Sequence, residues 1–512
     1  MHHLDDDHYR PVSASLPMIF MGACLPKPDL CHGPTISMGA AKRIANPLPV
    51  SYSTKVIGDA RLLPSGIKGK ISFFDFVRRE LPLRLKPLDA CCDVSVATWL
   101  EEAPYTLSRK TELSSLDIEE VNRPLKHVKC KSFIKDEHYF EFKHARTINP
   151  RDDYFKVFSG PVFHAIEKVV FEQPVFIKKI PLPERPQYIM DHIYSAGGVY
   201  QITDYTSFES SFTRPFMKAC EIQLYRFMTK NLPGGEEWCD VVEKVLTGKQ
   251  ELVFKRAKVK TLAGRCSGDM CTSLGNGFSN WMLMLYCAYV QDLGSLHAVF
   301  EGDDGLCRFS SGRVVDSNLL SSLGFTVKME VVSSISDASF CGLLFDEHDR
   351  QQIGDPMEFL ARLGWTTAKY LGSKRSTLLA LLRSKALSGL YQYPSCPIIS
   401  VLCRRVIDLT RGICIRRLIK CKGLSVWDRE RLKQAILFKD LCEPVGIGTR
   451  ALVSKHFGVS PDQQILLEQQ LSAVTFGQIA LPISWNPVWG RVWERYVTER
   501  WPVINDPWHV AR

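Results

Sequence analysis

The sequence predicts an α+β protein in which a sheet occupies the middle of the chain and helices form its C-terminal part. Residues 199–204 alternate like a half-buried strand, and residues 297–301 and 305–309 are two more strand candidates around a Gly-Asp-Asp turn. Beyond residue 355, apolar residues recur at four-residue, helical spacing. Because 512 residues exceed what one compact core usually supports, we expect two or three lobes.

Composition excludes several classes of protein. With 45% hydrophobic and 23% charged residues, the chain is typical of folded globular proteins rather than disordered or fibrous ones. Its longest apolar run, residues 281–290, is about half the ~20 residues that a membrane-spanning helix needs, so we expect no transmembrane segment. The 17 cysteines are scattered without a CxxC pair or zinc-type spacing, which favours a reducing compartment and free thiols.

The positive charge is concentrated in one part of the chain. The whole sequence carries +10, while residues 361–430 contain 14 basic and 3 acidic residues, a local charge of +11. A basic run of this kind is either a solvated face or a surface for a polyanion such as nucleic acid.

Four short motifs follow one another in a fixed order. They are Asp204-Tyr-Thr-Ser-Phe-Glu209, Ser267-Gly-Asp-Met-Cys-Thr-Ser-Leu-Gly-Asn276, Gly302-Asp303-Asp304 and Gly324-Phe-Thr-Val-Lys328. Lys135-Asp-Glu137 through Arg146 precedes them and Ser339-Phe-Cys-Gly342 follows. A lone Gly-Asp-Asp is most often a solvated turn. The ordered set resembles motifs F, A, B, C, D and E of RNA-dependent RNA polymerases of positive-strand RNA viruses. The resemblance covers roughly residues 130–345. Within it, the residues of motifs B, D and E are most similar to those of tombusvirus-like and nodavirus-like enzymes.

The resemblance implies a metal site made of carboxylates. Asp204 and Asp303 would bridge two Mg²⁺ ions, for which Mn²⁺ is a possible substitute, and Asp304 would complete the group. Physical chemistry agrees, since two carboxylates on adjacent strand ends repel by roughly 4 kcal/mol at an effective dielectric of 20 unless a cation lies between them.

The same resemblance assigns the residues that bind the incoming nucleotide. Thr272 and Asn276 lie four residues apart, on one face of a helix, and with Glu209 would read the ribose 2′-hydroxyl. Ser267 and Gly268 would form the turn that contacts template and nucleotide. The alternative for Thr272 is a hydroxyl that serves only the helix terminus.

Basic side chains are expected around the triphosphate. Arg146, with Lys135 and Lys143, would contact phosphate oxygens, because guanidinium groups match them bidentately. Lys328 is the candidate general acid that protonates pyrophosphate. Each of these residues could instead be a solvated surface charge.

The resemblance further implies a right-hand polymerase fold. We expect fingers at 1–195 and 212–262, a palm with an antiparallel sheet at 196–211 and 263–350, and a helical thumb at 351–512. Residues 1–70, rich in Pro, Gly, Ser and His, are predicted to be an extended segment without a readable function. The thumb would hold RNA backbone through four arginines, which are Arg404, Arg405, Arg416 and Arg417.

Two other functions fit parts of the sequence. A reverse transcriptase also pairs aspartates in its palm, but it usually carries an aromatic residue two places before them, where this chain has Glu301. An inactive RNA-binding scaffold would not need the intact set of acids. The resemblance implies template and product RNA and ribonucleoside triphosphates as partners. It also suggests other viral replication proteins and host membranes, in replication complexes of the host cytoplasm.

Overall fold

The computed structural model describes residues 22–24, 69–135, 146–255, 257–367, 370, 373–420, 424, 426–438 and 444–475. It divides the chain into two compact units. The first contains residues 1–26, 182–187 and 342–512, and the second contains residues 27–181 and 188–341. The expected boundary before the thumb was residue 351. Most of the expected fingers and palm lies in the second unit, while residues 1–26, 182–187 and 342–350 belong to the first, and the boundaries between fingers and palm stay a prediction.

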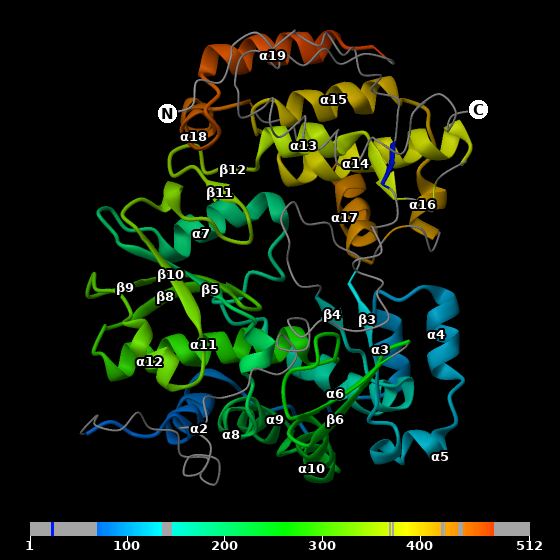
Figure 1. The fold of residues 1–512 in the computed structure, drawn as a ribbon, viewed down its shortest axis with the longest axis vertical. Coiled ribbons are helices and arrows are strands. Elements are labelled where there is room, and N and C mark those ends of the chain that lie inside the picture. Colours follow the sequence, from blue (N-terminus) through cyan, green and yellow to red (C-terminus); the bar gives the residue numbers. More distant parts are fainter. Residues whose placement is uncertain are drawn as a thin grey trace. The chain divides into compact units, whose positions relative to one another are not determined.

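A four-stranded antiparallel sheet organises the second unit (Figure 1). Its strands lie in the order β10 (Val327–Val332), β5 (Tyr200–Tyr205), β9 (Asp304–Phe309) and β8 (Leu296–Glu301). All three strands expected from the alternating pattern are present, within one or two residues of the expected bounds. The mixture of this sheet with many helices confirms the α+β class.

The hairpin β8–β9 is tight because of its turn residues. Glu301 pairs with Asp304, so that Gly302 and Asp303 form a two-residue loop. Gly302 has φ +67°, a backbone conformation that glycine adopts without steric cost. Inward-facing Val299 and Leu306 are fully buried and hold the hairpin on the core.

Helix α11 (Thr272–Val290) packs on this sheet through β8 (Figure 1). Its apolar residues join an aromatic-rich core in which Phe216 and Phe325 stack edge to face, with ring centroids 4.6 Å apart. The other helices of the second unit are α2 (Phe73–Arg84), α3 (Val96–Glu102), α4 (Leu107–Ser114), α5 (Ile118–Val121), α6 (Asp153–Val170), α8 (Arg214–Ala219), α9 (Glu221–Thr229), α10 (Gly235–Leu246) and α12 (Ser317–Ser322). Helix α7 (Arg185–Ile193) crosses the boundary between the units.

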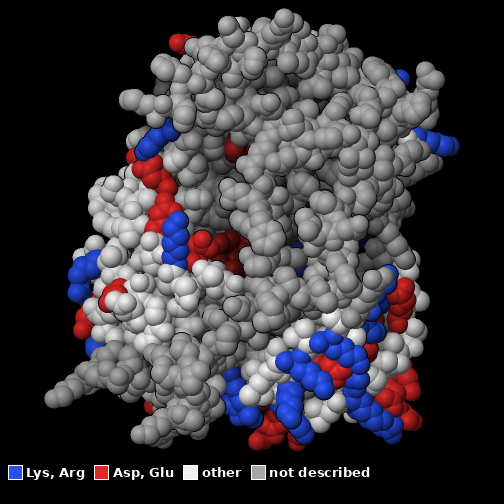
Figure 2. Space-filling model, viewed as in Figure 1, with Lys and Arg blue, Asp and Glu red and all other residues white. Residues whose placement is uncertain are grey.

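A smaller sheet adjoins the loop that precedes α11. It consists of β2 (Cys130–Lys131), β6 (Lys249–Val253) and β7 (Lys258–Leu262), while β3 (Phe133–Ile134) and β4 (Thr147–Ile148) form a separate pair. Its outward face carries five lysines and one acid, Glu251; the lysines are Lys129, Lys131, Lys249, Lys258 and Lys260. Figure 2 shows blue side chains gathered where Figure 1 draws β6. Exposed positive charge therefore also occurs outside residues 361–430.

The first unit is mainly helical, as its sequence pattern predicts. It contains α13 (Pro356–Leu363), α14 (Arg375–Gln392), α15 (Ile399–Leu409), α16 (Arg416–Lys420), α17 (Val426–Leu437), α18 (Ile447–Phe457) and α19 (Pro461–Ala473). Its short strands pair as β11 (Leu344–Phe345) with β12 (Gln352–Ile353) and β1 (Gly22–Cys24) with β13 (Trp365–Thr367). Leu402 and Val453 are fully buried in its separate hydrophobic core. Among the residues described, no helix is long and apolar enough to cross a membrane.

A buried ion pair fixes how closely α11 approaches its neighbours. Arg265 binds Glu221 with both side chains fully buried, and Tyr225 donates to the same carboxylate at 2.8 Å. A methyl group at Gly275 would overlap Nη2 of Arg265 and lie 2.6 Å from Oε2 of Glu221. Only glycine leaves this pair intact.

We therefore expect Gly275→Ala to lower the free energy of unfolding by about 3 kcal/mol, because the methyl group displaces a buried ion pair. Gly277→Ala is the matched control on the same helix. Its methyl group would meet a ring carbon of Phe176 at 3.1 Å, and a small ring movement limits the loss to about 1 kcal/mol. Chemical denaturation measures both. Equal losses would show that the ion pair does not set the helix position.

Candidate active site

Strand register brings the expected carboxylates to one end of the sheet. Thr203 on β5 pairs with Gly305 on β9, so the next residue of β5, Asp204, lies beside Asp304. Asp303 occupies the adjoining hairpin turn. Asp204 is therefore a neighbour of Asp303 and Asp304, which follow it in the sequence by 99 and 100 residues.

Burial and neighbouring acids raise the pKa values of Asp303 and Asp304. Burial, followed by Glu209 and Asp304, raises the pKa of Asp303 to about 6, while the nearby Arg146 lowers it. Burial is also the main cause of the raised pKa of Asp304, to which Glu301 and Asp204 add. Carboxylates that raise each other's pKa favour a cation in their midst.

The donor set fits divalent metal ions of the hard, oxygen-binding kind. Asp204, Asp303 and Asp304 supply only carboxylate oxygens, which are the ligands that Mg²⁺ prefers. As the side chains stand, no group of three or more His, Cys, Asp or Glu within the described ranges is close enough to hold an ion. The chemistry of the acids, rather than a closed coordination shell, therefore supports a metal site.

A buried asparagine on α11 donates a hydrogen bond to the turn formed by Gly302 and Asp303. Asn280 on α11 donates from Nδ2 to the carbonyl oxygen of Asp303 at 2.9 Å, and its Oδ1 accepts from the hydroxyl of Tyr205 at 3.2 Å. Asn280 is fully buried. It thus ties strand β5, the turn and α11 together.

One turn earlier on α11, Asn276 faces motif A. Its Nδ2 lies 3.5 Å from Oε1 of Glu209, and its side chain is nearly buried. Its Oδ1 is buried and has no hydrogen-bond partner among the described residues. Glu209 therefore contacts an amide whose buried oxygen has no hydrogen-bond partner among the described residues.

The hydroxyl of Thr272 serves the loop before α11. It donates towards the carbonyl oxygens of Asp269 at 2.9 Å and Cys266 at 3.2 Å, and it accepts from the backbone N–H of Gly268 at 3.2 Å. Gly268 has φ +105°, and the carbonyl of Ser267 accepts from the N–H of Asn149 at 2.6 Å. The structure thus shows Thr272 in a role at the helix terminus, and its expected contact with ribose stays a prediction.

The basic candidates are distributed around the acids. Lys328 on β10 pairs directly with Asp204 on β5, so both exposed side chains share one face. Lys135 donates from its backbone N–H to Arg146 at 2.9 Å, just past the β3–β4 pairing. Lys143 lies outside the described residues.

Comparison with known proteins identifies a domain within the chain. The model of the family described as viral RNA-dependent RNA polymerase matches residues 162–398. The chain carries a viral RNA-dependent RNA polymerase domain. A comparison with curated proteins gives no significant match.

This polymerase domain includes the whole acidic cluster. Its matched range includes β5, β8, β9, β10 and α11, and therefore every carboxylate discussed above. The activity is RNA-directed RNA synthesis, a nucleotidyl transfer, and it implies binding of RNA and nucleotides. Lys135 and Arg146 lie before the match.

The four arginines expected to hold RNA lie beyond the matched range of the polymerase domain and differ in their surroundings. Arg404 donates to the carbonyl of Pro394 at 2.8 Å, and Arg405 to that of Val474 at 2.7 Å. Arg416 is exposed on α16, and the side chain of Arg417 lies outside the described residues. Arg404 and Arg405 thus have roles in packing, and RNA contact stays a prediction for all four.

Sequence reasoning missed two residues that hold the loop and the turn around the site. Asn280 is an interior helix residue, and a periodic apolar helix gives no sign that one of its amides holds a turn. Arg151 pairs with Asp269 of the loop before α11, with Nε 3.0 Å from Oδ1. Their separation of 118 residues left no local pattern that could reveal the pair.

Proposed function

We propose that this polymerase replicates a viral RNA genome by two-metal-ion nucleotidyl transfer from ribonucleoside triphosphates. The observation that carries the proposal is the meeting of Asp204, Asp303 and Asp304 at adjacent strand ends, where burial and neighbouring acids raise the pKa values of Asp303 and Asp304. Asp204 and Asp303 would hold both ions, with Asp304 beside them. Two divalent ions held there would supply activation of the attacking 3′-hydroxyl and neutralisation of charge on the transferred phosphate.

The other side chains then handle the triphosphate. Arg146 is near enough to Asp303 for its charge to lower the pKa of that acid, so a phosphate at the site would meet its guanidinium. Lys135 and Lys143 belong to the same sequence motif as Arg146. Lys328, paired with Asp204, is in place to give a proton to the departing pyrophosphate.

Selection of ribonucleotides is assigned to the buried amide on α11. A 2′-hydroxyl can donate to the available Oδ1 of Asn276, whereas a deoxyribose leaves this acceptor unsatisfied. Glu209 fixes the amide from the other side. The same nucleotide would also be contacted by Ser267 and Gly268 of the preceding loop and by Thr272 at the start of α11.

The wider arrangement follows the right-hand polymerases. We assign the helical first unit to the thumb and the smaller sheet, with β3 and β4, to the fingers. Because the sequence around its motifs resembles that of tombusvirus-like and nodavirus-like enzymes, we propose that the chain is an enzyme of this kind. It would act in membrane-associated replication complexes of the host cytoplasm, with other viral proteins as partners.

Removing the bridging acid tests the metal assignment. Asp303→Ala is expected to lower nucleotide incorporation by several orders of magnitude, because both ions lose a shared ligand, while RNA binding stays close to normal. Primer extension and fluorescence anisotropy measure the two quantities. Asp240→Ala, which removes an exposed acid on α10, is the control and should keep full activity. Normal turnover in Asp303→Ala would contradict the assignment.

Shortening Glu209 tests the choice of sugar. Glu209→Asp withdraws the carboxylate from Asn276 by about 1 Å, so the ratio of kcat/KM for ribonucleotides to that for deoxyribonucleotides should fall about 10-fold, or roughly 1.4 kcal/mol. Glu330→Asp, an equal shortening on the exposed face of β10, should leave the ratio unchanged. If Glu209→Asp slows both sugars equally, Glu209 does not act in sugar choice.

Arg416 is the described arginine best placed to test RNA contact by the thumb. Arg416→Gln should reduce the salt dependence of RNA binding by about 0.7 in the log–log slope, which is one phosphate contact on a single strand. The control is Arg123→Gln, which removes an exposed arginine that pairs with Glu120. An unchanged slope for Arg416→Gln would show that this surface does not bind RNA.

A further inference from the structure

The loop that precedes α11, residues 266–271, is held by a buried guanidinium group. Arg151 is 4% exposed, and its Nε donates to Asp269, with 3.0 Å to Oδ1 and 3.2 Å to Oδ2. Its Nη2 lies 3.8 Å from the sulfur of Cys266 at the start of the loop. One side chain thus contacts both ends of the turn that carries Ser267 and Gly268.

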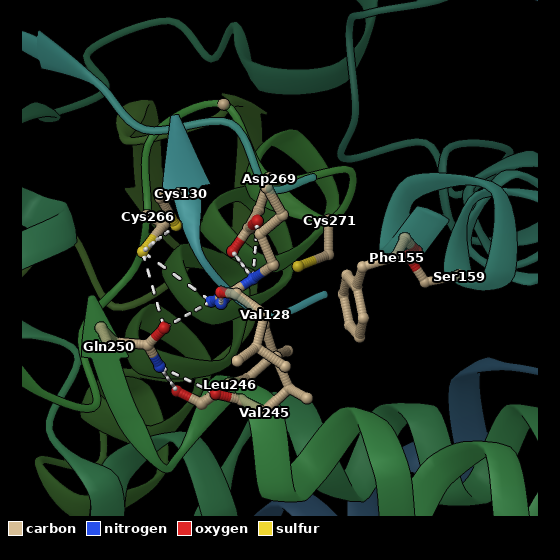
Figure 3. Close-up of polar contacts among 12 residues, drawn as sticks. Val128, Cys130, Phe155, Ser159, Val245, Leu246, Gln250, Cys266, Asp269 and Cys271 are labelled. Atoms are coloured by element: carbon tan, nitrogen blue, oxygen red, sulfur yellow. Dashed lines mark hydrogen bonds and ion pairs between the residues drawn. The ribbon is translucent and has the colours of Figure 1, made fainter. Parts of the chain in front are cut away.

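The same guanidinium is itself fixed by the smaller sheet. Nη2 donates to Oε1 of Gln250 on β6 at 2.7 Å, and Nη1 donates to the carbonyl of Val128 at 2.9 Å. Figure 3 shows Gln250, Cys266 and Asp269 converging on this point, with Cys130 beside Cys266. Because the guanidinium is planar, these acceptors determine its orientation.

Gln250 is in turn locked by the end of a helix. Its Nε2 donates to the carbonyls of Val245 at 2.8 Å and Leu246 at 3.0 Å, near the C-terminus of α10. The amide therefore presents its oxygen to Arg151 in one orientation only. A continuous series of buried hydrogen bonds runs from α10 through Gln250 and Arg151 to Asp269.

A stabilising role alone does not explain the buried ion pair of Arg151 and Asp269. Burying two charges carries a desolvation penalty that well-packed apolar side chains avoid, so a buried pair is weak evidence for a stabilising role. What the pair does supply is a fixed geometry for a loop that contains glycine. Backbone at Gly268 has φ +105° and needs external contacts to hold one conformation.

We propose that Arg151, through Asp269 and Gln250, is a positioning residue that sets the conformation of the loop 266–271 for nucleotide addition. The inference rests on the proposed role of Ser267 and Gly268 at the nucleotide. The polar contacts of Arg151 are with Asp269, Val128, Gln250 and Cys266 rather than with the acidic cluster, so it acts through the loop.

The decisive variant removes the pair without leaving a buried charge. Arg151→Met alone leaves the buried Asp269 carboxylate without its positive partner and should destabilise the fold. In the double variant Arg151→Met/Asp269→Asn, the isosteric amide removes that charge and the melting temperature should largely recover. The proposal expects kcat/KM for single-ribonucleotide addition to stay on the order of 100-fold below the unmodified chain, with the Kd for primer–template RNA unchanged.

Two further variants separate positioning from folding. Val77→Ala truncates a fully buried core residue on α2 and should lower the melting temperature without lowering kcat/KM below that temperature. Arg151→Lys keeps the buried charge pair but loses the planar fork, so it should remain folded and lose about 10-fold in kcat/KM. It answers the question even if the double variant does not fold.

Either of two results would overturn the proposal: a folded double variant with normal turnover, or an Arg151→Lys protein as active as the unmodified chain. Failure of the unmodified chain to extend a primer on RNA would instead contradict the proposed polymerase function.

Discussion

Antiparallel pairing of β5 with both β9 and β10 is the constraint on which the active site depends. The register of β5 with β9 sets Thr203 opposite Gly305, and that of β5 with β10 sets Asp204 opposite Lys328, so the carboxylates and the lysine lie at the same end of the sheet. A slip of one residue would turn Asp204 to the opposite face. Buried Tyr200 and Leu306 oppose that slip, because it would expose them to water.

Helix α11 carries the polar groups that serve this sheet end. Thr272, Asn276 and Asn280 lie at four-residue intervals, and they contact the preceding loop, Glu209 and the Gly-Asp turn respectively. The close approach requires Gly275, beside the buried pair of Arg265 and Glu221. The sheet fixes the acids, and the helix fixes what surrounds them.

Sequence patterns predicted those elements whose conformation depends on residues that are close in sequence. Alternation predicted β5, and the Gly-Asp-Asp turn predicted the β8–β9 hairpin, because both depend on residues close in sequence. The hydroxyl of Thr272 could not be assigned, since a helix-terminal residue can face either its loop or a ligand. Arg151 and Asn280 could not be found, because their partners are determined by tertiary packing. The arginines 404 and 405 illustrate the same limit, since a basic run does not reveal which members have backbone partners.

This site joins ribonucleotides under the direction of an RNA template. The most direct measurement of this activity is primer extension by the full chain on a defined RNA template, with Mg²⁺ and either ribonucleoside or deoxyribonucleoside triphosphates. We expect template-matched incorporation of ribonucleotides and a clear preference for them over deoxyribonucleotides. Preferential use of deoxyribonucleotides, or RNA binding without any templated extension, would contradict the claim.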